Sequence, residues 1–205
     1  MLTESSCDLF NLPFFQFAQM KKYCPEDIPL IKAKYKQHWT IWKALHLTVS
    51  QQLGQPFAPP HIEKWCNGWQ VRAHFFAYYK YVYYQDSAAI LSVILNRRRL
   101  SVSLDWHRYR AERSKISLSK YNQWLELMDH KRYQEFDIWR GRENEYANFR
   151  PLKVLREADL MLEDAQDFFR IGKNIEKSAL ETIDSVAFIY QTICELTELY
   201  ESCHR

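Results

Sequence analysis

Hydrophobic residues recur with helical spacing in the first part of the chain. Between residues 25 and 54, apolar or aromatic residues recur at Ile28, Ile31, Tyr35, Trp39, Trp42, Leu45 and Val49. Intervals of three and four residues place these side chains on one face of a helix. Pro25 suits the first turn, and Gly54 followed by prolines suits the end. We therefore expect a long helix over residues 25–54, preceded by a short helix over Leu9–Met20.

Beyond residue 68 the pattern changes to aromatic and β-branched residues, which is typical of strands. It predicts a long strand over Trp69–Tyr84, or two with a bend, and further strands over Ala88–Leu95 and Leu100–Trp106. In the last of these strands, apolar residues alternate with Ser101, Ser103 and Asp105. Successive side chains of a strand point to opposite faces, so one face should be buried and the other polar.

The remaining chain is less regular. The expected elements are a helix over Ser119–His130, a strand over Gln134–Trp139, a loop over Gly141–Pro151, a helix over Val154–Leu162 and a short strand over Phe168–Ile171 that ends at Gly172. Ser178-x-x-Glu181 has the spacing of a capping box, which predicts the start of a closing helix. The side chains expected to face inward from that helix are Ile183, Val186, Tyr190, Ile193 and Tyr200.

This order of elements predicts a single α+β domain over residues 1–205, with an antiparallel central sheet flanked by N-terminal and C-terminal helices. The helical part covers residues 1–60, the sheet-rich part 68–140 and the closing helical part 151–205. The chain has 205 residues, of which 47% are hydrophobic and 16% aromatic. That aromatic content supports a folded core and argues against disorder.

Only four glycines occur in the chain, and the closest two, Gly54 and Gly68, are fourteen residues apart. This spacing excludes the glycine-rich loops of dinucleotide-binding and P-loop enzymes. The five cysteines contain no C-x-x-C pair, the histidines contain no H-x-x-H pair, and no serine lies in a G-x-S-x-G motif. We therefore expect no metal site and no cofactor, free thiols in a reducing cytoplasm, and neither a signal peptide nor a membrane span.

Two pairs of polar residues suggest chemistry on the polar face of the sheet. Arg72 and His74 are two residues apart on the first strand, and Asp105 and His107 are two apart on the third. Each pair therefore points to one side of its strand. If the strands are neighbours, the four side chains form a candidate catalytic group for acid–base work, because histidine titrates near neutral pH.

The middle of the chain is also basic. Residues 91–150 carry a net charge of +5, whereas residues 151–205 carry −5. Arginines that contact phosphates, combined with aromatic rings that stack on bases, are typical of nucleic-acid binding. A glycine turn before a helix would add a weaker anion site. The candidate ligand-binding residues are Arg97, Arg98, Arg99, Trp106, Arg108, Arg110 and Lys173. A solvated rim on an ordinary folded domain accounts for the same arginines.

Several segments resemble a family of small uncharacterised bacterial proteins. They are Gly68-Trp-Gln-Val-Arg-Ala-His74, Leu100-Ser-Val-Ser-Leu-Asp-Trp-His107, Ser117-Leu-Ser-Lys-Tyr-Asn-Gln-Trp124 and Glu198-Leu-Tyr-Glu201. Some members carry the label glucose-6-phosphate 1-dehydrogenase, which implies a sugar phosphate as substrate. The missing dinucleotide fingerprint disagrees with that label. A looser likeness in the order of elements, to the DNA-reading domains of modification-dependent restriction enzymes, implies only a similar arrangement.

Three hypotheses follow. The first is a non-catalytic cytoplasmic binding domain for nucleic acid or another polyanion, which uses the basic, aromatic sheet region. The second is a small-metabolite enzyme that uses Arg72, His74, Asp105 and His107. The third is a protein that docks on a partner or forms a homodimer through exposed aromatic residues.

Overall fold

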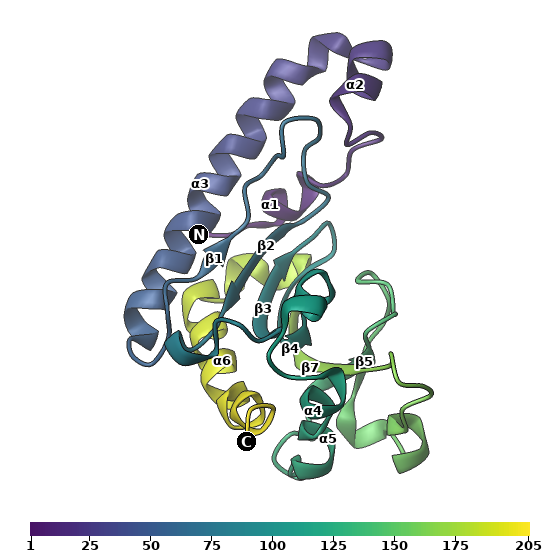
Figure 1. Ribbon diagram of the computed structural model, residues 1–205. Coiled ribbons are helices and arrows are strands. Elements are labelled where there is room, and N and C mark those ends of the chain that lie inside the picture. The colour runs from purple at the N-terminus through teal and green to yellow at the C-terminus, as the bar shows by residue number, and fades with distance from the viewer.

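Seven antiparallel strands form one sheet in the computed structural model of this chain, which describes residues 1–205 (Figure 1). The strands are β1 (His61–Ile62), β2 (Phe75–Tyr79), β3 (Ala89–Leu95), β4 (Arg99–Trp106), β5 (Asp137–Arg140), β6 (Arg150–Pro151) and β7 (Phe169–Glu176). Their order across the sheet is β1-β2-β3-β4-β7-β5-β6. The late strand β7 therefore lies between β4 and β5, and each edge strand is two residues long.

Six α-helices surround the sheet. They are α1 (Glu4–Asp8), α2 (Phe17–Tyr23), α3 (Ile28–Leu53), α4 (Leu118–Asn122), α5 (Trp124–Leu127) and α6 (Ser185–Ser202). The two long helices, α3 and α6, lie together on one side of the sheet (Figure 1). This arrangement confirms the predicted α+β class, with helices from both ends of the chain against a central antiparallel sheet.

The core lies between the sheet and the two long helices, α3 and α6. Val102 and Leu104 of β4 are completely buried, as are Ile189 and Ile193 of α6. Each such side chain contributes about 1.5–3 kcal/mol when it is fully buried. Because Val102 and Leu104 alternate with Ser101, Ser103 and Asp105, the polar residues of β4 point to the opposite face. The strand pattern therefore decides which face of the sheet carries polar chemistry.

The N-terminal prediction is correct for the long helix and wrong for the short one. Helix α3 ends at Gly54 as expected, with Gly54 in the left-handed region (φ 57°). Most of the expected helix over Leu9–Met20 is absent: α1 ends at Asp8, α2 begins at Phe17, and the segment between them is irregular. Pro13 lies in that segment, and a proline removes the amide that a continuous helix would need.

The hairpin of β3 and β4 is also where the pattern predicts it, but the strand before it is shorter. Only Phe75–Tyr79 of the expected Trp69–Tyr84 strand forms β2, and Val82–Tyr84 forms a 3-10 turn. The polar face predicted for β4 is not a solvated surface, because every residue of this strand is buried. The helix expected over Ser119–His130 is divided into α4 and α5.

The final third contains three corrections. Residues 154–162 form no α-helix, because only the 3-10 turns Leu152–Val154 and Glu157–Leu160 occur there. Ser178 does not cap a helix; α6 begins at Ser185, where Asp184 Oδ1 accepts hydrogen bonds from the amides of Val186 (2.9 Å) and Ala187 (3.2 Å). Strand β7 continues through Gly172, so that residue lies inside the sheet.

Candidate functional site

An open cavity of about 840 Å³ lies over the polar face of the sheet. Its floor includes Phe76 of β2, Ser101, Ser103 and Asp105 of β4, and Arg170 of β7. One wall is a loop between β5 and β6, residues 142–149, which we call the strap. Glu143, Asn144, Glu145, Tyr146 and Phe149 of the strap line the cavity. Because the strap lies across this face of the sheet, it helps to bury the polar side of β4.

The structure brings the four predicted polar residues to this one cavity. Arg72 and His74 precede β2, and Asp105 and His107 lie at the end of β4. Strands β2 and β4 are separated by β3 alone, and Phe76 of β2 is aligned with Ser101 of β4 through Ile94 of β3, so their side chains share one face of the sheet. The Phe76 ring lies 6.5 Å from the His74 ring and 5.8 Å from the His107 ring. The catalytic role of these residues remains a prediction.

Three of the four side chains have an oppositely charged partner in the cavity. Arg72 Nη2 lies 2.8 Å from Glu63 Oε1, and His74 Nδ1 lies 3.0 Å from Glu145 Oε2. Asp105 Oδ1 accepts a 2.5 Å hydrogen bond from Arg170 Nε. Charge-assisted contacts of this kind fix the orientation of the side chains. The cavity therefore presents charge in matched pairs.

The protonation of His74 depends on Glu145. Burial alone would lower the pKa of His74, but the hydrogen bond and charge of Glu145 raise it above the ordinary value. The Glu145 pKa lies below its usual range, because His74 outweighs the effect of burial on that carboxyl group. The pair therefore favours a protonated His74 beside an ionised Glu145.

His107 behaves differently. Burial lowers its pKa, and the nearby Asp105 only partly opposes this effect. Its Nδ1 atom is buried and has no hydrogen-bond partner in the chain. Buried polar atoms are normally paired, so an unpaired ring nitrogen beside a cavity marks a position where a bound molecule can supply the partner.

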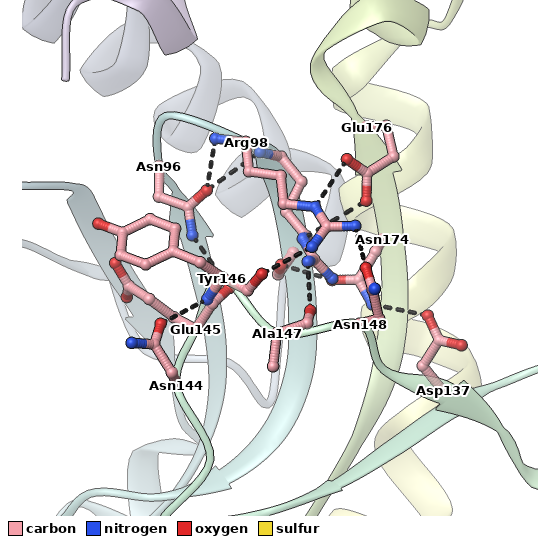
Figure 2. A network of polar contacts seen from close by, with 12 residues as sticks. Asn96, Arg98, Asp137, Asn144, Glu145, Tyr146, Ala147, Asn148, Asn174 and Glu176 are labelled. Carbon is pink, nitrogen blue, oxygen red and sulfur yellow. Dashed lines mark hydrogen bonds and ion pairs between the residues drawn. The ribbon is translucent and has the colours of Figure 1, made fainter. Parts of the chain in front are cut away.

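The arginine turn between β3 and β4 holds the strap in place (Figure 2). Arg98 donates to Tyr146 O and Asn148 Oδ1, each at 2.6 Å, and Arg99 donates to Ala147 O at 2.5 Å. The turn itself is closed by Asn96, whose Oδ1 accepts from the amides of Arg98 (2.9 Å) and Arg99 (3.0 Å). These arginines are therefore engaged within the protein.

The other predicted ligand-binding residues lie at different places in the structure. Arg97 is exposed and its guanidinium lies 4.4 Å over the Tyr146 ring. Arg110 is also exposed, over Tyr78. Arg108 is exposed, lines the cavity and forms no ion pair. Trp106 also borders the cavity, but its ring packs in the core, 5.5 Å from the Tyr121 ring. Lys173 lies within β7, and its Nζ is 2.5 Å from Glu195 Oε2 of α6. Because Gly172 lies inside the same strand, no glycine turn precedes a helix here, and the expected anion site is absent.

Two important cavity residues were not identified from the sequence. Arg170 lies within the strand expected over Phe168–Ile171, between the buried Phe169 and Ile171, so this alternation could have placed it on the polar face. Glu145 lies in the strap, and no periodic pattern predicts which loop residue faces the sheet. Its position depends on the contacts of Arg98 and Arg99 with the neighbouring backbone.

We expect the substitution Arg98→Ala to loosen the strap. It removes two charged hydrogen bonds to the strap, each worth about 1.5–3 kcal/mol when buried, together with the exposed contact between Arg98 and Glu176. The amides of Tyr146 and Ala147, which are paired within the strap, should exchange with solvent roughly tenfold faster, a cost of about 1.4 kcal/mol. Hydrogen–deuterium exchange measures this effect. Arg113→Ala, at an exposed arginine without an ion pair, is the control, and unchanged strap exchange in Arg98→Ala would contradict the role of the turn.

The comparisons with other proteins agree with the resemblance. A sequence model of a protein family matches residues 2–203. An uncharacterized protein of Haemophilus influenzae is 61% identical over 204 residues, which covers 100% of this chain and 99% of the relative. The chain belongs to this bacterial family. The match spans both the sheet and the flanking helices, so the cavity residues all lie within the region that defines the family.

Two further observations bear on function. No group of three or more His, Cys, Asp or Glu side chains is placed to hold a metal ion. No helix has both the length and the apolar character needed to cross a membrane.

Proposed function

We propose that the protein is a binding domain that holds a small polar molecule between the sheet and the strap. One observation carries the proposal: polar residues that are distant in sequence line one cavity of about 840 Å³. Small-molecule pockets typically enclose about 300–1,000 Å³ and combine apolar walls with a few placed polar groups. The free Nδ1 of His107 supports the same conclusion. The five free cysteines support a site of action in the cytoplasm.

The distribution of charge favours a compact ligand over an extended polyanion. Arg98, Arg99 and Lys173 already have partners within the chain. The cavity itself combines three arginines with four carboxylates, which are Arg72, Arg108, Arg170, Glu63, Asp105, Glu143 and Glu145. Binding of a long nucleic acid would require uncompensated positive charge along a surface.

The test is to fill the cavity. Ser103→Phe places a ring on the cavity floor, and Val82→Phe places the same ring at an exposed position elsewhere. Ligand binding is measured by saturation-transfer NMR with glucose 6-phosphate and adenosine 5′-monophosphate, and by fluorescence anisotropy with a 20-nucleotide single strand. We expect Ser103→Phe to abolish the small-molecule signal and Val82→Phe to retain it. Binding of the single strand alone, equally strong in both variants, would contradict the proposal.

A second candidate function is catalysis on the bound molecule. The observation that favours it is the pairing of His74 with Glu145 in the same cavity as the unpartnered His107. One histidine would then donate a proton and the other accept one. Glucose 6-phosphate or the nucleotide incubated with the protein would be converted to product, and His74→Gln would abolish turnover while retaining binding. Binding without any turnover would leave the binding domain as the function.

A further inference from the structure

One end of the cavity has an aromatic wall that is formed by two stacked rings. Trp139 of β5 and Phe149 of the strap both line the cavity, and their rings stack with centroids 4.1 Å apart and an interplanar angle of 8°. Trp139 is paired in the sheet with Arg170, which lies beside Asp105. The aromatic wall therefore adjoins the Arg170–Asp105 pair. Trp139 is 5% exposed, its ring stacks on Phe149, and the guanidinium of Arg99 lies 4.6 Å over the Phe149 ring, so a bound molecule meets the rim of the stack. Contact with that rim favours the edge-to-face approach of a planar, unsaturated ring over a puckered sugar.

The Arg170–Asp105 pair presents both donors and acceptors to the cavity. Arg170 uses Nε for its bond to Asp105 Oδ1, and its two terminal nitrogens make no hydrogen bond in the chain. Asp105 Oδ2 is likewise without a hydrogen bond. The pair can thus donate to one atom of a ligand and accept from another. Adjacent donors and acceptors along one edge of a planar ring are the characteristic chemistry of nucleobases.

One arginine that lines the cavity has no carboxylate partner. Arg72 and Arg170 are both neutralised by carboxylates, whereas Arg108 forms no ion pair. Arg108 is exposed and lies next to Tyr109, whose side chain lines the cavity and is 98% exposed. Phosphate groups are recognised by arginines with free N–H donors. A phosphate would therefore contact Arg108, while the interior holds an uncharged group.

We infer that the ligand is a nucleotide, with its base against Trp139 and the Arg170–Asp105 pair and its phosphate beside Arg108. This inference rests on the proposed function and names the chemistry of its ligand. The nucleotide can be free, or it can be an unpaired residue of a single strand. Both sources present the same base and phosphate to the cavity.

Isothermal titration calorimetry with the intact protein tests the base. The probes are the 5′-monophosphates of adenosine, guanosine, cytidine and uridine, and the comparator is ribose 5-phosphate, which has the same sugar and phosphate without a base. We expect at least one nucleotide to bind ten times more tightly than ribose 5-phosphate. Trp139→Leu should lower the affinity for that nucleotide roughly tenfold. Trp69→Leu removes a tryptophan that is 73% exposed and outside the cavity, and should leave affinity unchanged.

The role of Arg108 provides a second test that does not depend on a buried residue. Arg108→Gln should lower the affinity for the nucleotide but leave the affinity for the corresponding nucleoside unchanged, because the nucleoside has no phosphate. Equal losses for both molecules would overturn the placement of the phosphate. Circular dichroism of each variant shows whether it is folded.

The outcomes separate this inference from the proposed function. If ribose 5-phosphate or glucose 6-phosphate binds as tightly as every nucleotide, the inference fails and the binding domain stands. If none of these molecules binds, both fail. If a four-nucleotide single strand binds more tightly than the mononucleotide, the inference is supported and the natural ligand is a residue of a single strand. If the mononucleotide binds more tightly, the inference is supported and the natural ligand is a free nucleotide.

Discussion

Lowering the pH from 7.5 to 5 should reduce the free energy of unfolding by about 2 kcal/mol through His46 alone, and by about 4 kcal/mol by pH 3.5. His46 is a completely buried residue of α3, with its Nδ1 atom 2.6 Å from the hydroxyl oxygen of Tyr79. Burial lowers its pKa to about 3. The unfolded chain binds a proton at this histidine near pH 6.5, whereas the folded protein does not until about pH 3. Stability is therefore lost as the pH falls through that interval.

Urea denaturation at a series of pH values measures this loss. His46→Gln removes the titrating group, so the variant should lose about 2 kcal/mol less than the wild type between pH 7.5 and 5. The absolute stability of the variant can be lower without affecting this difference. His130→Gln, which replaces an exposed histidine, serves as the control and should follow the wild type. Identical pH slopes for the wild type and His46→Gln would refute the assignment.

The substitution Gly172→Ala should destabilise the protein by about 3 kcal/mol, at the upper end of the usual cost of overpacking. Gly172 lies in β7 opposite Ser103 of β4. A Cβ atom at this position would lie 2.1 Å from Val102 O and 2.7 Å from Ser103 Cβ. The nearest atom belongs to the backbone of a central strand, so it cannot move aside without disturbing the sheet.

Chemical denaturation of Gly172→Ala should show a lower midpoint with an unchanged slope. Lys173→Ala is the matched control in the same strand, because it removes a partly exposed ion pair worth at most about 1 kcal/mol. A loss in Gly172→Ala no greater than that in Lys173→Ala would show that β4 and β7 can separate at little cost.

The long, regular elements could be predicted from the sequence because their periodic patterns match the faces that they bury. Helix α3 and the β3–β4 hairpin are the clearest examples, and both lie within a few residues of the expected bounds. The failures occur where tertiary packing decides the structure. Gly172 was interpreted as the end of a strand, yet in the sheet it allows β4 and β7 to approach closely. Ser178-x-x-Glu181 matched a capping pattern, but Asp184 makes the cap.

The candidate site was only partly predictable for a related reason. Alternation along β4 identified Asp105, since a strand's period determines which side chains share a face. Arg72 and His74 line the same cavity although they precede β2 and lie outside the strand. Alternation could not reveal Glu145, whose position depends on a loop folding back over the sheet. The same loop changes the meaning of the arginine turn. Arg98 and Arg99 were candidates for phosphate contacts, and in the structure they bond to the strap.

The brevity of the two edge strands has a consequence for how copies of this protein can associate. Strands β1 and β6 contribute two residues each, and β6 ends in Pro151, which has no amide hydrogen to donate. An exposed edge normally acts as a template on which a neighbouring chain adds a strand. Here that template is too short to bind one. A neighbouring chain therefore finds only two residues of strand at each edge on which to pair, and this limits growth of the sheet by strand addition.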